Sequence, residues 1–109
     1  MMNFIKTHIQ SNIATIIIDR ENSLNALNSD VIMELNQSFI SCMKDTKVGV
    51  IILTGHGDKA FIAGADIKSM SLMKSSDALN FSRLGQELTC NIEESPKPVI
   101  AAVNGYALG

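Results

Sequence analysis

Two short runs of apolar, mostly β-branched residues constrain the fold of this chain more than any other feature of its sequence. They lie at residues 50–54 and 99–103, and neither alternates between apolar and polar side chains. A strand of this composition is typical of one covered on both faces, as in a parallel sheet between layers of helices. The sequence therefore predicts an α/β fold.

The first part of the chain predicts a hairpin followed by a helix. Residues 4–9 and 13–19 are rich in β-forming residues and flank a short polar turn, as in an antiparallel hairpin. A helix through about residue 45 is expected after Asn28 or Ser29, because either side chain can cap it. Its buried face is predicted from apolar residues at intervals of three and four: Val31, Ile32, Leu35, Phe39 and Met43.

A second helix precedes the last apolar run. Its predicted buried face consists of Phe81, Leu84, Leu88 and Ile92, and Pro96 ends it because proline lacks the N–H that a helix needs. The expected order is β-β-α-β-α-β within one domain over residues 1–109. An α/β chain ordinarily enters a helix after a strand and a turn such as Asn104-Gly105. We therefore expect this chain to be the N-terminal portion of a longer domain.

Charge and composition exclude several classes of partner. Nine basic and eleven acidic residues give a net charge of −2, and no run of like charge occurs. Binding to nucleic acid or to an anionic membrane is not expected of such a chain. The apolar runs fall far short of the roughly 20 residues that span a bilayer, and no secretory signal is visible, so a cytoplasmic location is expected. Cys42 and Cys90 lack metal-binding spacing, and we interpret both as reduced packing residues.

Few residues in the sequence are suited to catalysis. His8 lies in a predicted strand and His56 in a glycine-rich loop, with no nucleophile motif near either. The small residues at 63–66 are different, because they stand between an apolar segment and a helical one and let a ligand approach the backbone. Their N–H groups could bind an anion or an oxyanion. The alternative is a tight turn whose Asp66 caps a helix, and Lys68 fits either a ligand phosphate or the surface.

Three motifs at matching separations carry a resemblance that covers the whole chain. They are FIAGADIK at 61–68, PVIAAVNGYALG at 98–109, and the pair IATIIIDR and LNAL at 13–20 and 24–27. With these motifs the sequence resembles the crotonase superfamily, and within it most of all the enoyl-CoA hydratases. Glu21 is a departure, since relatives commonly have proline after the arginine, and it affects a turn rather than the chemistry.

The resemblance implies a spiral of ββα units, incomplete here, whose active site binds acyl-CoA thioesters. The backbone N–H of Ala65 is implied to be one donor of an oxyanion hole. Gly109 matches the first glycine of a triplet whose second supplies the other donor, and the family's two catalytic glutamates lie further along. The implied substrate-binding residues are Ser23, Leu24 and Ala26 beside coenzyme A, with Ala63, Gly64, Ala65, Asp66, Ile67, Lys68 and Gly109 around the thioester.

The function implied for the complete protein is addition of water to 2-enoyl-CoA thioesters in fatty-acid metabolism such as β-oxidation. Coenzyme A would be part of the substrate, and no metal or other cofactor is implied. A homotrimer or a dimer of trimers is expected, and the 109 residues alone are expected to be inactive. The alternatives are an enoyl-CoA isomerase or another crotonase-family acyl-CoA enzyme, and a non-catalytic CoA-binding or truncated product. A generic nucleotide-binding α/β domain is weakened because no GxGxxG motif is present.

Overall fold

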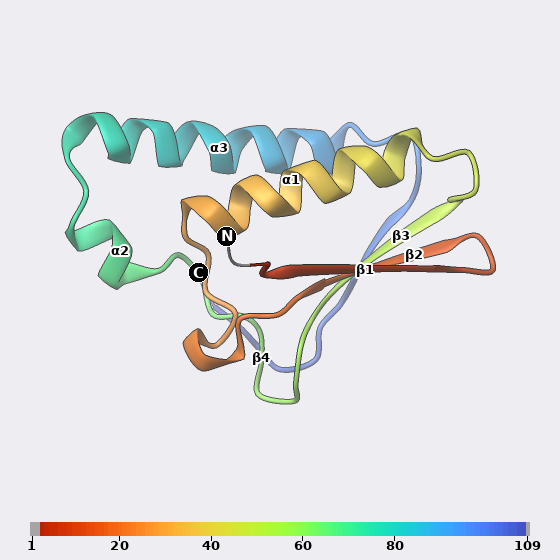
Figure 1. Ribbon diagram of the computed structural model, residues 1–109, viewed down its shortest axis with the longest axis horizontal. Helices are drawn as coiled ribbons and strands as arrows, with labels where there is room; N and C mark the ends of the chain where they lie inside the picture. Colours follow the sequence, from red (N-terminus) through yellow and green to blue (C-terminus); the bar gives the residue numbers. More distant parts are fainter. Residues whose placement is uncertain (1–2, 109) are drawn as a thin grey trace.

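The computed structural model describes residues 3–108, and its centre is a four-stranded sheet in the order β1-β2-β3-β5 (Figure 1). The first two strands form an antiparallel hairpin, and β2, β3 and β5 are parallel. The strands are β1 (Ile5–Gln10), β2 (Ile13–Ile18), β3 (Val50–Gly55) and β5 (Val99–Ala102). The predicted α/β fold, hairpin and parallel apolar strands are confirmed.

The two long helices lie on one face of this sheet (Figure 1). The two long ones are α1 (Ser29–Lys44) and α3 (Ser75–Glu93), and Figure 1 shows them side by side and running in the same direction. Asn28 is the N-cap of α1, as predicted, because its side chain accepts a hydrogen bond from the N–H of Val31 at 2.9 Å. The short elements are a 3-10 turn, η1 (Glu21–Ser23), and α2 (Ile67–Ser71). No helix within residues 3–108 combines the length and the apolar character needed to cross a membrane.

The core lies between α1 and the inner strands. Alternate residues of β2 point toward the helices, and Ala14, Ile16 and Ile18 are completely buried there. The predicted apolar face of α1 packs against these residues. In α3, Leu88 is buried, and the other predicted residues, Phe81, Leu84 and Ile92, are partly buried at the edge of the core. The buried apolar cluster comprises Ala14, Ile16, Ile18, Val31, Ile32, Leu35, Phe39, Cys42, Val48, Ile51 and Leu88.

The opposite face of the sheet is uncovered in the described residues. Ile52 of β3 pairs with Ile100 of β5 on this side; Ile52 is half-buried, and Ile100 is 51% exposed. Residues 3–108 cover one face of residues 50–54 and 99–103, and cover on the second face stays a prediction for the complete domain. The apolar composition of a strand reflects everything that packs on it in the complete domain. Residues 3–108 place helices on one face of the sheet only.

A second sheet of two strands includes the last strand of the described residues. It pairs β4 (Ala60–Ile62) in parallel with β6 (Tyr106–Ala107), so a short strand follows the Asn104-Gly105 turn where a helix would ordinarily begin. Glycine is required in this turn because a Cβ at Gly105 would lie 2.3 Å from the carbonyl oxygen of Lys59. The sheet is too short to show a strand pattern in the sequence.

The two cysteines differ in their surroundings. Cys42 is buried in α1, where burial raises the pKa of its thiol, and this agrees with the prediction of a packing residue. Cys90 is exposed on α3, and the prediction is wrong there. It lies two residues after Leu88, which places it well around the helix from the buried side.

Candidate functional site

The candidate site is formed where two loops meet beyond the carboxyl ends of β2 and β3. Residues 24–27 follow β2, residues 63–66 follow β3 and β4, and the two segments run side by side as a short parallel pair. The N–H of Ala63 donates to the carbonyl of Leu24 at 3.2 Å, and the N–H of Leu27 donates to that of Gly64 at 2.9 Å. Two of the three motifs identified in the sequence are thus in direct contact.

The backbone N–H of Ala65 points away from this pairing. The two neighbours of Ala65 both bond to Leu27, which donates to Gly64 and accepts from the N–H of Asp66 at 2.8 Å. In a parallel pair the intervening residue then directs its own N–H and C=O to the other side. Ala65 is exposed, and its N–H has no hydrogen-bond acceptor within residues 3–108. It is an available donor at the surface.

Asp66 fixes the far end of this turn. One carboxylate oxygen accepts from the N–H of Ser69 at 3.3 Å and caps α2, and the other pairs with Arg20 at 2.8 Å. The hydrogen bond from Arg20 holds the pKa of the Asp66 carboxyl below its usual value, partly opposed by burial. The predicted helix cap is confirmed, and it coexists with a free N–H at Ala65.

Arg20 connects both segments of the site, a role that the sequence analysis missed. The same guanidinium nitrogen that pairs with Asp66 donates to the carbonyl of Ala26 at 2.9 Å. The guanidinium also lies over the ring of Phe4, 5.5 Å from its centre. The sequence signal was an arginine directly after the predicted strand at residues 13–19, with three residues between it and the Leu24–Leu27 motif.

Two asparagines hold the surrounding loops, and neither was predicted as a site residue. Asn25 is 1% exposed; its side chain accepts from the N–H of Arg20 at 2.9 Å and donates to the carbonyl of Ala60 at 2.9 Å. Asn104 donates to that same carbonyl at 3.1 Å and accepts from the N–H of Gly55 at 3.0 Å. Both asparagines stand in the motifs that carried the resemblance, which was the available signal.

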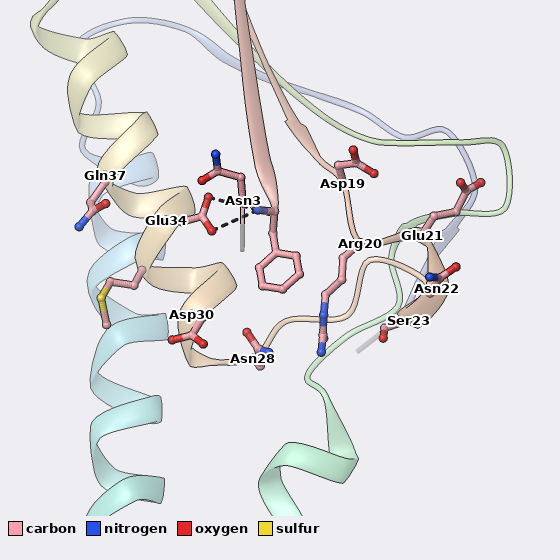
Figure 2. A pocket seen from close by; sticks show the side chains of 12 residues that line it. Asn3, Asp19, Arg20, Glu21, Asn22, Ser23, Asn28, Asp30, Glu34 and Gln37 are labelled. Carbon is pink, nitrogen blue, oxygen red and sulfur yellow. Dashed lines mark hydrogen bonds between the residues drawn. The ribbon is translucent and has the colours of Figure 1, made fainter. Parts of the chain in front are cut away.

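A hollow lies beside this site, not at it. Figure 2 shows side chains of α1 on one side of the hollow and the segment from Asp19 to Ser23 on the other. The hollow is open to solvent and has a volume of about 900 Å³. Ser23 lines the hollow, whereas the residues around Ala65 do not. Its carboxylates are partly used within the fold, since Glu34 accepts from the N–H of Phe4 at 3.1 Å. The acidic residues that line it are Asp19, Glu21, Asp30 and Glu34.

The remaining predicted residues lie next to the turn. Ile67 and Lys68 form the exposed start of α2, and Ile67 is 79% exposed. Ala26 is half-buried, and Leu24 is 41% exposed with a left-handed backbone, φ 53°. Gly109 lies outside the described residues. Within residues 3–108, no three side chains of the metal-binding types gather into a possible metal site.

The sequence as a whole matches the family described as enoyl-CoA hydratase/isomerase over residues 8–109. The chain belongs to this enoyl-CoA hydratase/isomerase family. It is 43% identical to a crotonyl-CoA hydratase from Syntrophomonas wolfei over 100 residues, which are 92% of this chain and 38% of that protein. It is 41% identical to a short-chain-enoyl-CoA hydratase from Clostridium acetobutylicum over 108 residues, 99% of this chain and 41% of the relative.

Solved structures of the family show the same fold. The crystal structure of an enoyl-CoA hydratase from Bacillus anthracis superposes with a TM-score of 0.93 at 32% identity, over 98% of this chain and 42% of that one. An enoyl-CoA hydratase from Thermoplasma volcanium gives a TM-score of 0.88 at 31% identity. The fold is the N-terminal part of the crotonase fold, as the resemblance implied. The chain spans about two fifths of the length of the curated relatives it matches.

Proposed function

We propose that a complete protein containing this chain adds water to 2-enoyl-CoA thioesters, and that the Ala65 N–H is one of its two oxyanion donors. One observation carries the proposal. The turn that binds Gly64 and Asp66 to Leu27 leaves the N–H of Ala65 exposed and without a partner in the described residues. The hydratases of Syntrophomonas and Clostridium to which the chain is similar support the reaction.

The proposed chemistry follows from such a donor. A backbone N–H that is held in place polarises the thioester carbonyl, and it stabilises the enolate oxygen that forms when water adds at Cβ. The enolate then takes a proton at Cα to give a 3-hydroxyacyl-CoA. Because the donor belongs to a hydrogen-bonded turn, it needs no reorganisation during the reaction, and losing one such donor typically lowers the rate by about 10²–10³.

The second donor and the two catalytic glutamates are proposed to lie outside residues 1–109, by the resemblance to the crotonase family. The acid and base roles of such carboxylates typically contribute about 10²–10⁴ each. The 109-residue chain by itself is therefore proposed to be inactive. The alternative of a CoA-binding or truncated product applies to the chain in isolation.

The placement of the substrate is proposed from the same turn. Ala63, Gly64 and Ala65 would contact the thioester, with Asp66, Ile67, Lys68 and Gly109 around it. The exposed apolar side chains of α2, Ile67 at 79% and Met70 at 43%, suit an acyl chain. Leu24 and Ala26, which run beside this turn, and Ser23 would lie along coenzyme A. The acidic lining of the neighbouring hollow repels phosphates, so the phosphates of coenzyme A are proposed to lie outside it.

The remaining properties of the complete protein are proposals from the family resemblance. Coenzyme A is part of the substrate, and the addition of water to a polarised enone needs no redox cofactor or metal. The complete protein is proposed to form a homotrimer or a dimer of trimers and to act in the cytoplasm.

The reaction is tested with crotonyl-CoA, whose conjugated enone absorbs in the ultraviolet and loses this absorbance on hydration. We expect the complete protein to hydrate crotonyl-CoA and the 109-residue chain to show no rate above background. Turnover by the chain at the rate of an intact hydratase would contradict the proposal that groups outside it are needed. If the complete protein instead only moves the double bond of a 3-enoyl-CoA, it is an isomerase, for which the same oxyanion donor would serve.

A further inference from the structure

Arg20 is a largely buried charged residue that bonds to both segments of the candidate site, residues 24–27 and residues 63–66. Its side chain is 16% exposed and that of Asp66 is 13% exposed. One guanidinium nitrogen bonds to Asp66 at 2.8 Å and to the carbonyl of Ala26 at 2.9 Å. Ala26 precedes Leu27, and Asp66 follows Ala65, so this nitrogen spans the pairing that orients the Ala65 N–H.

Two further contacts hold Arg20 itself in place. Its backbone N–H donates to the side chain of buried Asn25 at 2.9 Å, and its guanidinium packs over the ring of Phe4. Figure 2 shows its side chain extending between Asn28 at the start of α1 and Ser23 in the 3-10 turn. A guanidinium presents its donors in a fixed plane, whereas a lysine ammonium on a flexible stem does not. Arginine therefore fits this position better than lysine, because its planar group bonds to Asp66 and Ala26 while it packs over the Phe4 ring.

Backbone hydrogen bonds between residues 63–66 and residues 24–27 also hold the turn, and Leu27 packs against the core. The Asp66 side chain adds two contacts, the cap on Ser69 and the pair with Arg20. The helix that follows, α2, has five residues and no buried side chain, so packing does not fix it. The charged pair is the side-chain contact that ties this turn to Arg20, just past the end of β2.

We propose that Arg20 is a positioning residue that sets the direction of the Ala65 N–H toward the thioester oxygen, acting through Asp66. This inference rests on the proposed function for its catalytic consequence. Its structural half stands independently, since it concerns only how the turn is held. A misplacement of about 1 Å in a reacting geometry can lower a rate by about 10²-fold.

The structural half is tested by nuclear magnetic resonance on the 109-residue chain with Ile100→Lys in every sample, because the exposed Ile100 is expected to make the unsubstituted chain self-associate. Gly64-Ala65 is the only Gly-Ala pair in the sequence, so labelling glycine with ¹³C at the carbonyl and alanine with ¹⁵N selects the Ala65 N–H as one signal. We expect Arg20→Gln to shift and broaden this signal. Arg83→Gln is the matched control, because Arg83 is exposed on α3 and makes no ion pair within residues 3–108. A signal unchanged in Arg20→Gln relative to the control overturns the proposal.

The catalytic half is tested on the complete protein by separating kcat from KM. A donor that acts in the transition state lowers kcat and kcat/KM together when displaced. We expect a 10- to 100-fold loss of kcat in Arg20→Gln with KM changed less than threefold, a smaller loss in Arg20→Lys, and no loss in Arg83→Gln. An increase in KM at unchanged kcat would overturn the proposal and place Arg20 in general substrate binding.

A spectroscopic signature distinguishes positioning from loss of folded protein. Acetoacetyl-CoA forms an enolate whose negative oxygen resembles the one proposed for the reaction, and the enolate absorbs differently from the ketone. We expect Arg20→Gln to lower the enolate fraction of the bound thioester, while Arg83→Gln leaves it unchanged. If Arg20→Gln does not fold, Asp66→Asn replaces it, because asparagine keeps the cap on Ser69 and loses the charged pair. Failure of both variants to fold would make the pair purely structural and overturn the proposal.

Failure of the proposed function gives a different result. If the unsubstituted complete protein neither hydrates crotonyl-CoA nor binds acetoacetyl-CoA, the function is wrong, and the labelled Ala65 signal still decides whether Arg20 holds the turn.

Discussion

Replacing Asn25 by alanine removes the buried amide that holds the loops of the site together. The side chain of Asn25 is 1% exposed and makes hydrogen bonds to Arg20, His56 and Ala60, at 2.9, 3.2 and 2.9 Å. After the substitution the Ala60 carbonyl keeps its bond from Asn104. The backbone N–H of Arg20 loses its hydrogen-bond acceptor, and the carbonyl of His56 loses a hydrogen-bond donor.

The size of the effect follows from these groups. A buried polar group left without a partner costs about 1–3 kcal/mol, so the lost bonds at Asn25 should cost about 2–3 kcal/mol. Asn25 also has φ of 57°, and an alanine in the left-handed region adds about 1–2 kcal/mol. The expected loss of unfolding free energy is about 3–5 kcal/mol, which is large beside a domain stability of about 5–15 kcal/mol.

Asn12 is a matched control for this substitution. It has φ of 68°, and its exposed side chain makes one hydrogen bond, to the Lys47 carbonyl at 3.0 Å. Asn12→Ala should therefore lose only the conformational part, about 1–2 kcal/mol. In urea titrations followed by circular dichroism, the extra loss of about 2–3 kcal/mol in Asn25→Ala corresponds to a midpoint lower by about 1.3–2 M at an m-value of about 1.5 kcal/mol per M. Equal losses in the two variants would refute the role assigned to the buried amide.

Three further predictions concern the site turn and the open sheet face. The pKa of Asp66 is lowered in the folded chain, so its contribution to stability is present above the ordinary aspartate pKa of about 3.9 and is lost as the pH falls below it. Asp66→Asn should therefore reduce the fall of the unfolding free energy at acidic pH. The same fall in the variant and in the unsubstituted chain would contradict this. Ile100 is 51% exposed on edge strand β5, so the 109-residue chain should self-associate through this strand. Sedimentation should show a lower mass for Ile100→Lys, and a monomeric unsubstituted chain would contradict the prediction. In the complete protein, Ala65→Pro should abolish hydration and Ala65→Ser should be milder, because serine keeps the N–H; equal kcat/KM values in folded variants would exclude Ala65 as a donor.

The long elements were predictable from the sequence because their signals are local. The apolar spacing of α1 reflects one buried face, and Asn28 stands where a cap is needed. The apolar runs of β3 and β5 reflect burial in a parallel sheet, although the second face of that sheet is open in the described residues. The strand pair β4 and β6 could not be found, because pairing between residues 60 and 106 leaves no periodic pattern in either segment.

The site was only partly predictable, because its geometry depends on contacts between distant residues. The motif around Ala65 was identified from its small residues and its resemblance to a family, and the structure confirms that Asp66 caps α2. The role of Arg20 was missed because its partners Ala26 and Asp66 are 6 and 46 positions away, and no single-residue property marks such a bridge. Cys90 was assigned to packing from its residue type, but the direction in which α3 presents it decides its exposure.

The central claim is that the Ala65 N–H stabilises the oxyanion, and the most direct test removes this one hydrogen-bond donor. In the complete protein, lactic acid incorporated in place of Ala65 replaces the N–H by an ester oxygen and keeps the methyl group. No hydrogen bond within residues 3–108 uses this N–H, and the substitution weakens one bond, from the Leu27 N–H to the Gly64 carbonyl, so the ester variant is compared only after its folding is confirmed by circular dichroism. We predict that kcat/KM for crotonyl-CoA falls by about 10²–10³. A folded ester variant with kcat/KM within twofold of the unsubstituted protein would contradict the claim.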